Sequence, residues 1–281
     1  MSPKISIGLA TDKSYYKSTA QGGGSFDPDA TAFLTAAGIT DSTQQNAVNQ
    51  LVLDMKTANI WTKMKAVYPF VGGTASTHKW NLVNPVDSDA AFRLVFSGGW
   101  THSNTGALPN GTNAYADSKF DKANFNTNIN SYSLGVYLNS PLISTRYHFG
   151  ASGGSSNQVI SLRANNASEK TGYLETAFYL LTKTGLNTTT QQGFWAISKR
   201  ATNDRAMICS DGTFVYRTES AGVTQNSYTI FFGAQNAAGS PTQYDTMSHA
   251  FDFIADGLDD TELTNLRIAV QTFQTTLGRN V

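Results

Sequence analysis

Hydrophobic and polar positions follow different patterns on the two sides of residue 61. From there to residue 256, short runs rich in β-branched and aromatic residues alternate with turn residues, without a long helical pattern between them. Such regular spacing is typical of an antiparallel sandwich or barrel. The pattern predicts a mainly β fold, an antiparallel jelly-roll β-sandwich. Its strands are expected within residues 63–71, 78–83, 92–97, 114–120, 131–138, 145–151, 158–165, 174–182, 193–201, 205–210, 212–219, 228–235 and 249–256.

The clearest hairpin is predicted in the segment "AMICSDGTFVYR". Asp211 and Gly212 form a pair that readily adopts the positive φ angles of a two-residue hairpin turn, and both flanks are strand-like. Cys209, the single cysteine of the chain, lies in the first flank. One cysteine cannot form an intrachain disulfide or a multi-cysteine zinc site. We expect it to be a small buried strand residue rather than a nucleophile.

Residues 26–60 have helical spacing and are expected to form a helical segment before the sandwich. In the first helix, Asp27 is the expected N-cap, Pro28 occupies the first helical position and Gly38 ends the helix. The second helix begins at Asp41 or Ser42 and carries an apolar stripe, which we expect to pack on the rest of the chain rather than in a coiled coil between subunits. Ser42 also pairs with Gln45 in a capping-box pattern, and the stripe consists of Val48, Leu51, Val52 and Met55.

A C-terminal helix closes the predicted sandwich domain, which spans residues 61–281. Asp259 and Glu262 have the spacing of a capping box, and Gly278 is the expected stop. Apolar residues follow the cap at intervals of three and four positions, so the helix should lie against the sandwich. They are Leu263, Leu266, Val270, Phe273 and Leu277.

Residues 1–25 are expected to form an extended N-terminal arm, because a run of glycines uncouples them from the helices. In the arm, alternation places three apolar side chains on one face, as an added strand needs. We expect the arm to add to a sheet edge of a neighbouring virion protein. Self-association and an unstructured tail are the alternatives. The residues expected to make the assembly contacts are Ile5, Ile7, Leu9, Tyr15 and Tyr16.

Charge composition excludes some partners. Charged residues make up 14% of the 281 residues, and the formal net charge is zero. Without a basic patch, nucleic acid is not an expected partner. No apolar stretch has the length of a membrane span, so no membrane partner is expected either. A neutral surface rich in amides and hydroxyls suits extracellular, sugar-facing or assembled proteins.

Acidic residues offer little for catalysis. A glycoside hydrolase needs two carboxylates at a cleft, and none of the four glutamates has a second acid at strand spacing. We therefore predict no enzyme and no catalytic residue; a glycanase that uses Glu175 is the third-ranked alternative. The histidines lack metal-site spacing, and no cofactor is expected. A calcium site remains open at the aspartate pairs of "PVDSDAAF" and "GLDDTEL".

The segment "SGGWTHSNTGALPNGTNAYADSKF" contains the candidate ligand contacts. We interpret its first half as a surface loop and "NAYADS" as a strand with Tyr115 directed inward. Trp100 lies in the loop, where an aromatic ring can stack on a sugar. Trp100 and His102 are therefore the candidate ligand-binding residues.

Two resemblances add to this interpretation. Residues 110–139 and 228–263 resemble the opening and the close of the laminin-G-like, or concanavalin A-like, jelly roll. Residues 61–120, with "AVQTFQTTLGR" near the end, resemble a domain of tailed-bacteriophage virion proteins, including those of phages of Bacteroidetes.

The phage resemblance implies a non-enzymatic virion structural protein, part of a capsid decoration, head fibre or tail, made in the host bacterial cytoplasm and located in the virion. The alternative is a glycan-binding adhesin module that contacts host surface polysaccharide.

Overall fold

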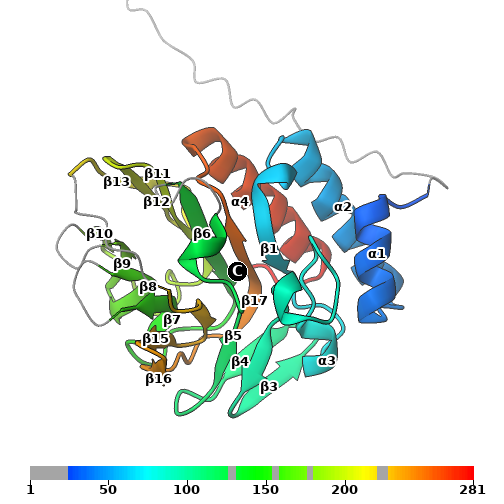
Figure 1. The fold of residues 1–281 in the computed structure, drawn as a ribbon, viewed down its shortest axis with the longest axis horizontal. Coiled ribbons are helices and arrows are strands. Elements are labelled where there is room, and N and C mark those ends of the chain that lie inside the picture. Colours follow the sequence, from blue (N-terminus) through cyan, green and yellow to red (C-terminus); the bar gives the residue numbers. More distant parts are fainter. Residues whose placement is uncertain (1–24, 126–130, 154–157, 176–179, 220–226) are drawn as a thin grey trace, which may run out of the picture.

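The computed structural model describes residues 25–125, 131–153, 158–175, 180–219 and 227–281 (Figure 1). The predicted arm, with Ile5, Ile7, Leu9, Tyr15 and Tyr16, lies outside the described residues. Two β-sheets form a sandwich, and helices cover the outer face of one of them, so the fold prediction is confirmed for the described part of the chain. The helices are α1 (Pro28–Ala37), α2 (Ser42–Thr57), α3 (Ala75–His78) and α4 (Asp260–Thr276), with short 3-10 turns η1 (Trp61–Lys63), η2 (Asp89–Ala91) and η3 (Lys122–Phe125).

The first sheet has the strand order β13-β12-β11-β6-β17-β4-β3, and β1 also pairs with β17. All of these pairs are antiparallel. The strands are β1 (Met64–Tyr68), β3 (Trp100–Ser103), β4 (Gly106–Pro109), β6 (Tyr132–Leu138), β11 (Gly193–Ala201), β12 (Asp204–Ile208), β13 (Phe214–Arg217) and β17 (His249–Ala255).

The second sheet has the order β10-β9-β8-β7-β14-β5-β2, with β15 and β16 beside β7. Its pairs are antiparallel except β15 with β7, which is parallel. The strands are β2 (Val95–Ser97), β5 (Tyr115–Asp117), β7 (Tyr147–Ser152), β8 (Val159–Asn166), β9 (Glu169–Leu174), β10 (Leu181–Thr184), β14 (Phe231–Phe232), β15 (Gln235–Ala237) and β16 (Ser240–Thr242).

Two hydrophobic cores lie on the two faces of the first sheet. Neighbouring residues of β17 show the division: Phe253 packs in the core under the helices, and Ile254 packs in the core between the sheets. The apolar stripe of α2 is fully buried and contacts α4, so the expected packing on the rest of the chain is confirmed. Alternation along each strand thus supplies both cores at once.

Most helix ends follow the local sequence signals. Asp27 caps α1, and Gly38 ends it with a φ of 67°. At α2 the Asp41 carboxylate accepts from the Gln44 amide at 2.9 Å. The predicted Ser42–Gln45 capping box is wrong, because Asp41 is the cap and the Gln45 side chain donates to the Ile39 carbonyl at 2.8 Å.

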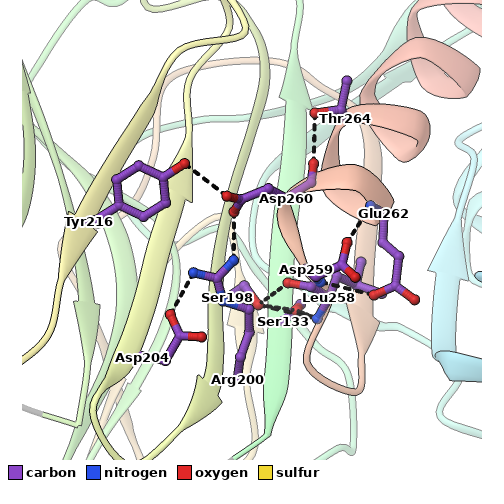
Figure 2. Close-up of polar contacts among 10 residues, drawn as sticks. All are labelled: Ser133, Ser198, Arg200, Asp204, Tyr216, Leu258, Asp259, Asp260, Glu262 and Thr264. Atoms are coloured by element: carbon purple, nitrogen blue, oxygen red, sulfur yellow. Dashed lines mark hydrogen bonds and ion pairs between the residues drawn. The ribbon is translucent and has the colours of Figure 1, made fainter.

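The capping box of α4 is confirmed, and it belongs to a larger junction with the first sheet (Figure 2). The Ser198 hydroxyl of β11 donates to the Leu258 carbonyl at 2.8 Å and lies 2.9 Å from the Ser133 hydroxyl of β6. Outside this buried pair, Arg200 binds Asp260 in the first turn of the helix at 2.5 Å. Two strands therefore fix the start of α4.

Some predicted strands and one turn type differ from the structure. Residues 174–182 are not a single strand, because β9 ends at Leu174, Glu175 has a φ of 67° and β10 begins at Leu181. Residues 78–83 do not form a strand, because the Asn81 side chain bonds the backbone of β1, accepting from Val67 at 3.0 Å. The hairpin between β12 and β13 is present, but Gly212 alone of the predicted pair has a positive φ, 83°. Cys209 is buried as expected.

Candidate functional site

The segment with the candidate ligand contacts forms a β-hairpin rather than a surface loop. Strands β3 and β4 pair from Trp100↔Pro109 to Ser103↔Gly106. Alternation along β3 makes Trp100 and His102 half-buried and leaves Thr101 and Ser103 exposed. The predicted ligand residues therefore face the interior of the molecule.

Trp100 packs against protein groups on several sides. Its indole donates to the Tyr115 carbonyl at 3.2 Å, and its ring centroid lies 5.4 Å from that of Phe96. Gly233 leaves the room that the ring occupies, since a Cβ there would lie 2.7 Å from a ring carbon. These contacts indicate that Trp100 stabilises the fold.

The strand after this hairpin has the opposite register from the one predicted. In β5 the fully buried residue is Ala116, whereas Tyr115 is half-buried and stacks on Phe231 with centroids 4.6 Å apart. The prediction that Tyr115 points inward is therefore wrong. Ala116 lies opposite Phe232 of β14, and this pairing sets which face is buried.

Three of the four histidines, His78, His148 and His249, are buried, and the fourth, His102, is half-buried. His249 lies between Asp252, at 2.9 Å, and Asp245, at 3.2 Å. Burial opposes protonation of His249, but the charges and hydrogen bonds of both carboxylates outweigh it and raise its pKa to about 10. His148 binds the same Asp245 oxygen at 2.7 Å, and burial lowers the pKa of His148 to about 4. His102 shares a 2.9 Å hydrogen bond with His78.

This buried network is a structural unit in which His148 and His249 both bind Asp245, although Nε2 of His148 has no hydrogen-bond partner among the described residues. Among the described residues, no group of three or more His, Cys, Asp or Glu side chains could hold a metal ion. Three of the four aspartates considered for calcium are bound to basic side chains: Asp87 pairs with Lys79 at 2.6 Å, Asp89 with Arg93 and Asp260 with Arg200. Asp259, the fourth, is the N-cap of α4.

Glu175, the residue of the glycanase alternative, is buried at one end of the sandwich. Its two carboxylate oxygens bind Lys122 and Lys199. All three side chains are at most 3% exposed. The partners of this carboxylate are cations, whereas hydrolysis needs a second acid across a cleft.

A row of cations crosses three neighbouring strands beside Glu175. Lys199 of β11 lies opposite Arg205 of β12, and Arg205 lies opposite Arg217 of β13. We call Lys199, Arg205 and Arg217 the cationic row. Opposite residues of an antiparallel pair point to the same face, so like charges are brought together.

A groove of about 710 Å³ lies between α4 and the loops that follow β10 and β12. We call it the α4 groove. Lys183 and Asp211 form an ion pair of 2.8 Å on one wall, and Arg267 donates to the Ser210 carbonyl from the helix. Hydroxyls and amides line much of the rest, from Thr184, Thr189, Thr190, Gln192 and Gln271, and Leu186 and Val281 add apolar surface.

Asp211 is ionised throughout the physiological pH range. Partial burial opposes its charge, but hydrogen bonds from Lys183 and Thr213 outweigh burial and lower its pKa to about 2. The α4 groove thus offers a permanent acceptor beside the donors of Lys183 and Arg267. Sequence analysis identified Asp211 only as a turn residue and did not single out Lys183 or Arg267, because the three come from segments that are joined only by the fold.

A second groove of about 480 Å³ lies along the β3–β4 hairpin. It is lined by Thr101 and Ser103, the neighbours of the predicted ligand residues, and by Leu108. Val281 borders both grooves. Trp100 and His102, the predicted ligand residues, alternate along β3 with the residues that line this groove and therefore point away from it.

Comparisons with known proteins identify a fold and no family. No protein-family model matches the chain, and no curated protein matches it. A mutant of Trypanosoma rangeli sialidase that displays trans-sialidase activity is similar in structure, with a TM-score of 0.52 and 11% identity over 82% of this chain and 39% of that one. This likeness supports the β-sandwich.

Two other solved structures are more distant. The NanB sialidase of Streptococcus pneumoniae has a TM-score of 0.41 at 14% identity, over 60% of this chain and 27% of that one. Botulinum neurotoxin type C, whose cell entry depends on two ganglioside molecules, has a TM-score of 0.48 at 11% identity, over 76% and 53%. The chain thus spans about a quarter of the NanB structure. In addition, no described helix is long and apolar enough to cross a membrane.

Proposed function

We propose that this chain is a non-catalytic carbohydrate-binding β-sandwich module that holds a glycan in the α4 groove. The observation that carries the proposal is the groove itself, about 710 Å³ of open space lined by hydroxyls, amides, one ion pair and the apolar side chains of Leu186 and Val281. Its size is that of a small-molecule site.

The chemistry of the groove suits a polyhydroxylated ligand. Each sugar hydroxyl both donates and accepts, so a site needs fixed groups of both kinds. Asp211 supplies acceptor oxygens, and Lys183 and Arg267 supply donors that are held in place by their own partners. Because no aromatic side chain is among the described residues that line the groove, we expect weak binding to one sugar and stronger binding to multivalent glycans.

The absence of catalysis is part of the proposal. The buried pairing of Glu175 with Lys122 and Lys199 supports it, because a carboxylate bound to two ammonium groups is a poor general acid. Purified protein should release no reducing ends from polysaccharides. Activity that Glu175→Gln abolishes would restore the glycanase alternative.

The phage resemblance of residues 61–120 adds a location to the proposal. We propose that the module is displayed on a virion, as capsid decoration, head fibre or tail component, where weak sites repeated over a particle bind a host polysaccharide together. The low charge of 14% agrees with a surface that faces sugars. Density for this chain in an intact particle tests the location, and its absence from purified particles would contradict it.

Glycan binding can be tested with two matched ion pairs. Lys183→Gln and Asp211→Asn remove the charges of the groove pair while leaving groups that can still hydrogen bond. Lys79→Gln and Asp87→Asn do the same to a control pair whose 24% and 45% exposures resemble the 24% and 50% of the groove pair. On a glycan array followed by calorimetry, we expect the groove variants to bind at least fivefold more weakly and the control variants to bind as the unchanged protein does. Equal binding by both sets would refute the site, and no binding by the unchanged protein would refute the function.

A further inference from the structure

Two members of the cationic row, Arg205 and Arg217, are bound to neutral oxygens where charge balance would favour carboxylates. Lys199 shares Glu175 with Lys122. Arg205 donates from Nη1 to the Glu219 carbonyl at 2.6 Å, and Arg217 donates to the Leu180 carbonyl at 2.9 Å. Backbone oxygens carry no full charge, so these contacts leave the two guanidinium charges uncompensated.

Arg205 has an open pair of donors. Its side chain is fully buried, and its Nε and Nη2 atoms have no hydrogen-bond partner within the described part of the chain. These two nitrogens share one edge of the planar guanidinium group. That edge binds a carboxylate, sulfate or phosphate through two parallel hydrogen bonds.

The register of the sheet explains why the row is unfavourable without a ligand. Arg205 lies directly opposite both Lys199 and Arg217. Like charges that lie directly opposite destabilise an antiparallel pair, and an unsatisfied buried donor adds a further penalty. An oxyanion at the open edge of Arg205 would remove both costs.

The row also has an accessible end. Strand β13 is the edge of its sheet, and Arg217 on it is exposed. Cations therefore continue from the interior to the surface, and Arg217 can meet an anion that approaches the edge. An exposed cation of this kind raises the association rate of an anion.

We propose that the cationic row is a binding site for an oxyanion group, held by the Nε and Nη2 edge of Arg205 and by the charges of Lys199 and Arg217. The group is a free inorganic ion or the acidic substituent of a sugar. The site lies apart from the α4 groove, which other residues line, so the two proposals can fail separately.

The test is calorimetry on the full chain at constant ionic strength, with sodium sulfate, sodium phosphate, sodium glucuronate and glucose as probes and sodium chloride as the reference. We expect saturable binding of at least one oxyanion and none of glucose at this site. Arg205→Lys keeps the charge but removes the planar edge, and Arg217→Gln removes the exposed cation. Each should weaken binding at least tenfold.

Arg163→Gln is the matched control, because Arg163 lies in β8 of the other sheet and contacts Tyr147. It should bind within twofold of the unchanged protein. If circular dichroism shows that Arg205→Lys does not fold, the test rests on Arg217→Gln. Arg217 is exposed, so its replacement should not prevent folding. Preference for glucuronate assigns the ligand to an acidic glycan, and equal binding of the inorganic ions assigns it to the free anion.

Heats identical to those of chloride, or full binding by Arg217→Gln, would overturn the oxyanion site. Arg217 does not line the α4 groove, so Arg217→Gln should still bind neutral glycans there. Measuring that binding shows whether the oxyanion site alone has failed or the α4 groove as well.

Discussion

The imidazole of His249 lies 2.9 Å from the carboxylate of Asp252, three positions along the same strand. In a regular strand these residues would face opposite sides of the sheet. A β-bulge in the pairing of β17 with β6 between His249 and Phe251 turns both toward the interior. A local irregularity thus creates a fully buried ion pair.

This pair predicts a pH-dependent contribution to stability. The pKa of His249 is raised to about 10 by Asp252 and Asp245 against burial, whereas an unfolded histidine titrates near 6.5. Its contribution is therefore complete below about pH 6.5 and is lost as the pH rises toward 10. His249→Gln should cost about 3–5 kcal/mol at pH 7.5 and clearly less at pH 10. Urea unfolding at both values measures the difference.

His78→Gln is the control for this experiment. Burial lowers the pKa of His78 to about 3, so it is neutral in both states at these pH values. Its effect on the free energy of unfolding should not change between pH 7.5 and 10. If His249→Gln behaves in the same way, the buried pair is not charged.

The register of β3 predicts opposite results for two neighbouring substitutions. Trp100→Ala removes a half-buried ring that packs on Phe96 and Gly233, and should lower the free energy of unfolding by about 2–4 kcal/mol. Thr101→Ala, on the exposed face, should change it by less than about 0.5 kcal/mol. Thermal unfolding measures both. A stable Trp100→Ala variant that loses glycan binding would instead support a direct contact between Trp100 and the ligand.

At the start of α4, a buried hydroxyl should matter more than an exposed ion pair. Ser198→Ala leaves the Leu258 carbonyl without its hydroxyl donor and should cost about 1–3 kcal/mol. Asp260→Asn weakens a pair with a 45% exposed carboxylate and should cost less than about 1 kcal/mol. Urea unfolding ranks the two variants, and the reverse order would contradict the model of this junction in Figure 2.

Cys209 should be chemically inert in the folded protein. Burial raises the pKa of its thiol to about 11, from a usual value of 9.0. At pH 8 the thiolate fraction is then about 100-fold below that of an ordinary cysteine. A disulfide reagent such as Ellman's should react at least that much more slowly before urea is added than after. Equal rates would show that the strand end opens freely.

Local signals made the helices predictable, because a cap depends on residues close in sequence. Asp27, Gly38 and Asp259 fix their ends through contacts within a few positions. Runs of apolar residues also predicted the presence of most strands. The strand predicted over residues 78–83 does not form, because β1 makes its backbone ladder with β17 and binds this segment through the Asn81 side chain and a single backbone hydrogen bond from Leu82.

The faces and the sites could not be predicted in the same way. Whether Trp100 or Thr101 faces the solvent depends on the pairing of β3 with β4. The hairpin is rich in polar residues, so its sequence resembles that of a loop. The cationic row requires a register across three strands, set by the bulge near Ala201 and the turn at Gly212. Local sequence marks the hairpin between β12 and β13, but it does not fix the register that places the three cations opposite one another.

The position of β17 also has a consequence for how the chain acquires its structure. This strand separates β6 from β1 and β4, although all three of those strands precede residue 139. During synthesis the early strands must wait for residues 249–255, so β1 and β6 each keep an unpaired edge until most of the chain has left the ribosome. Assembly of the sheet is therefore a late step dominated by distant pairings, and such topologies fold slowly. Newly made chains should be prone to aggregation until β17 is inserted, and should need chaperone protection during that interval.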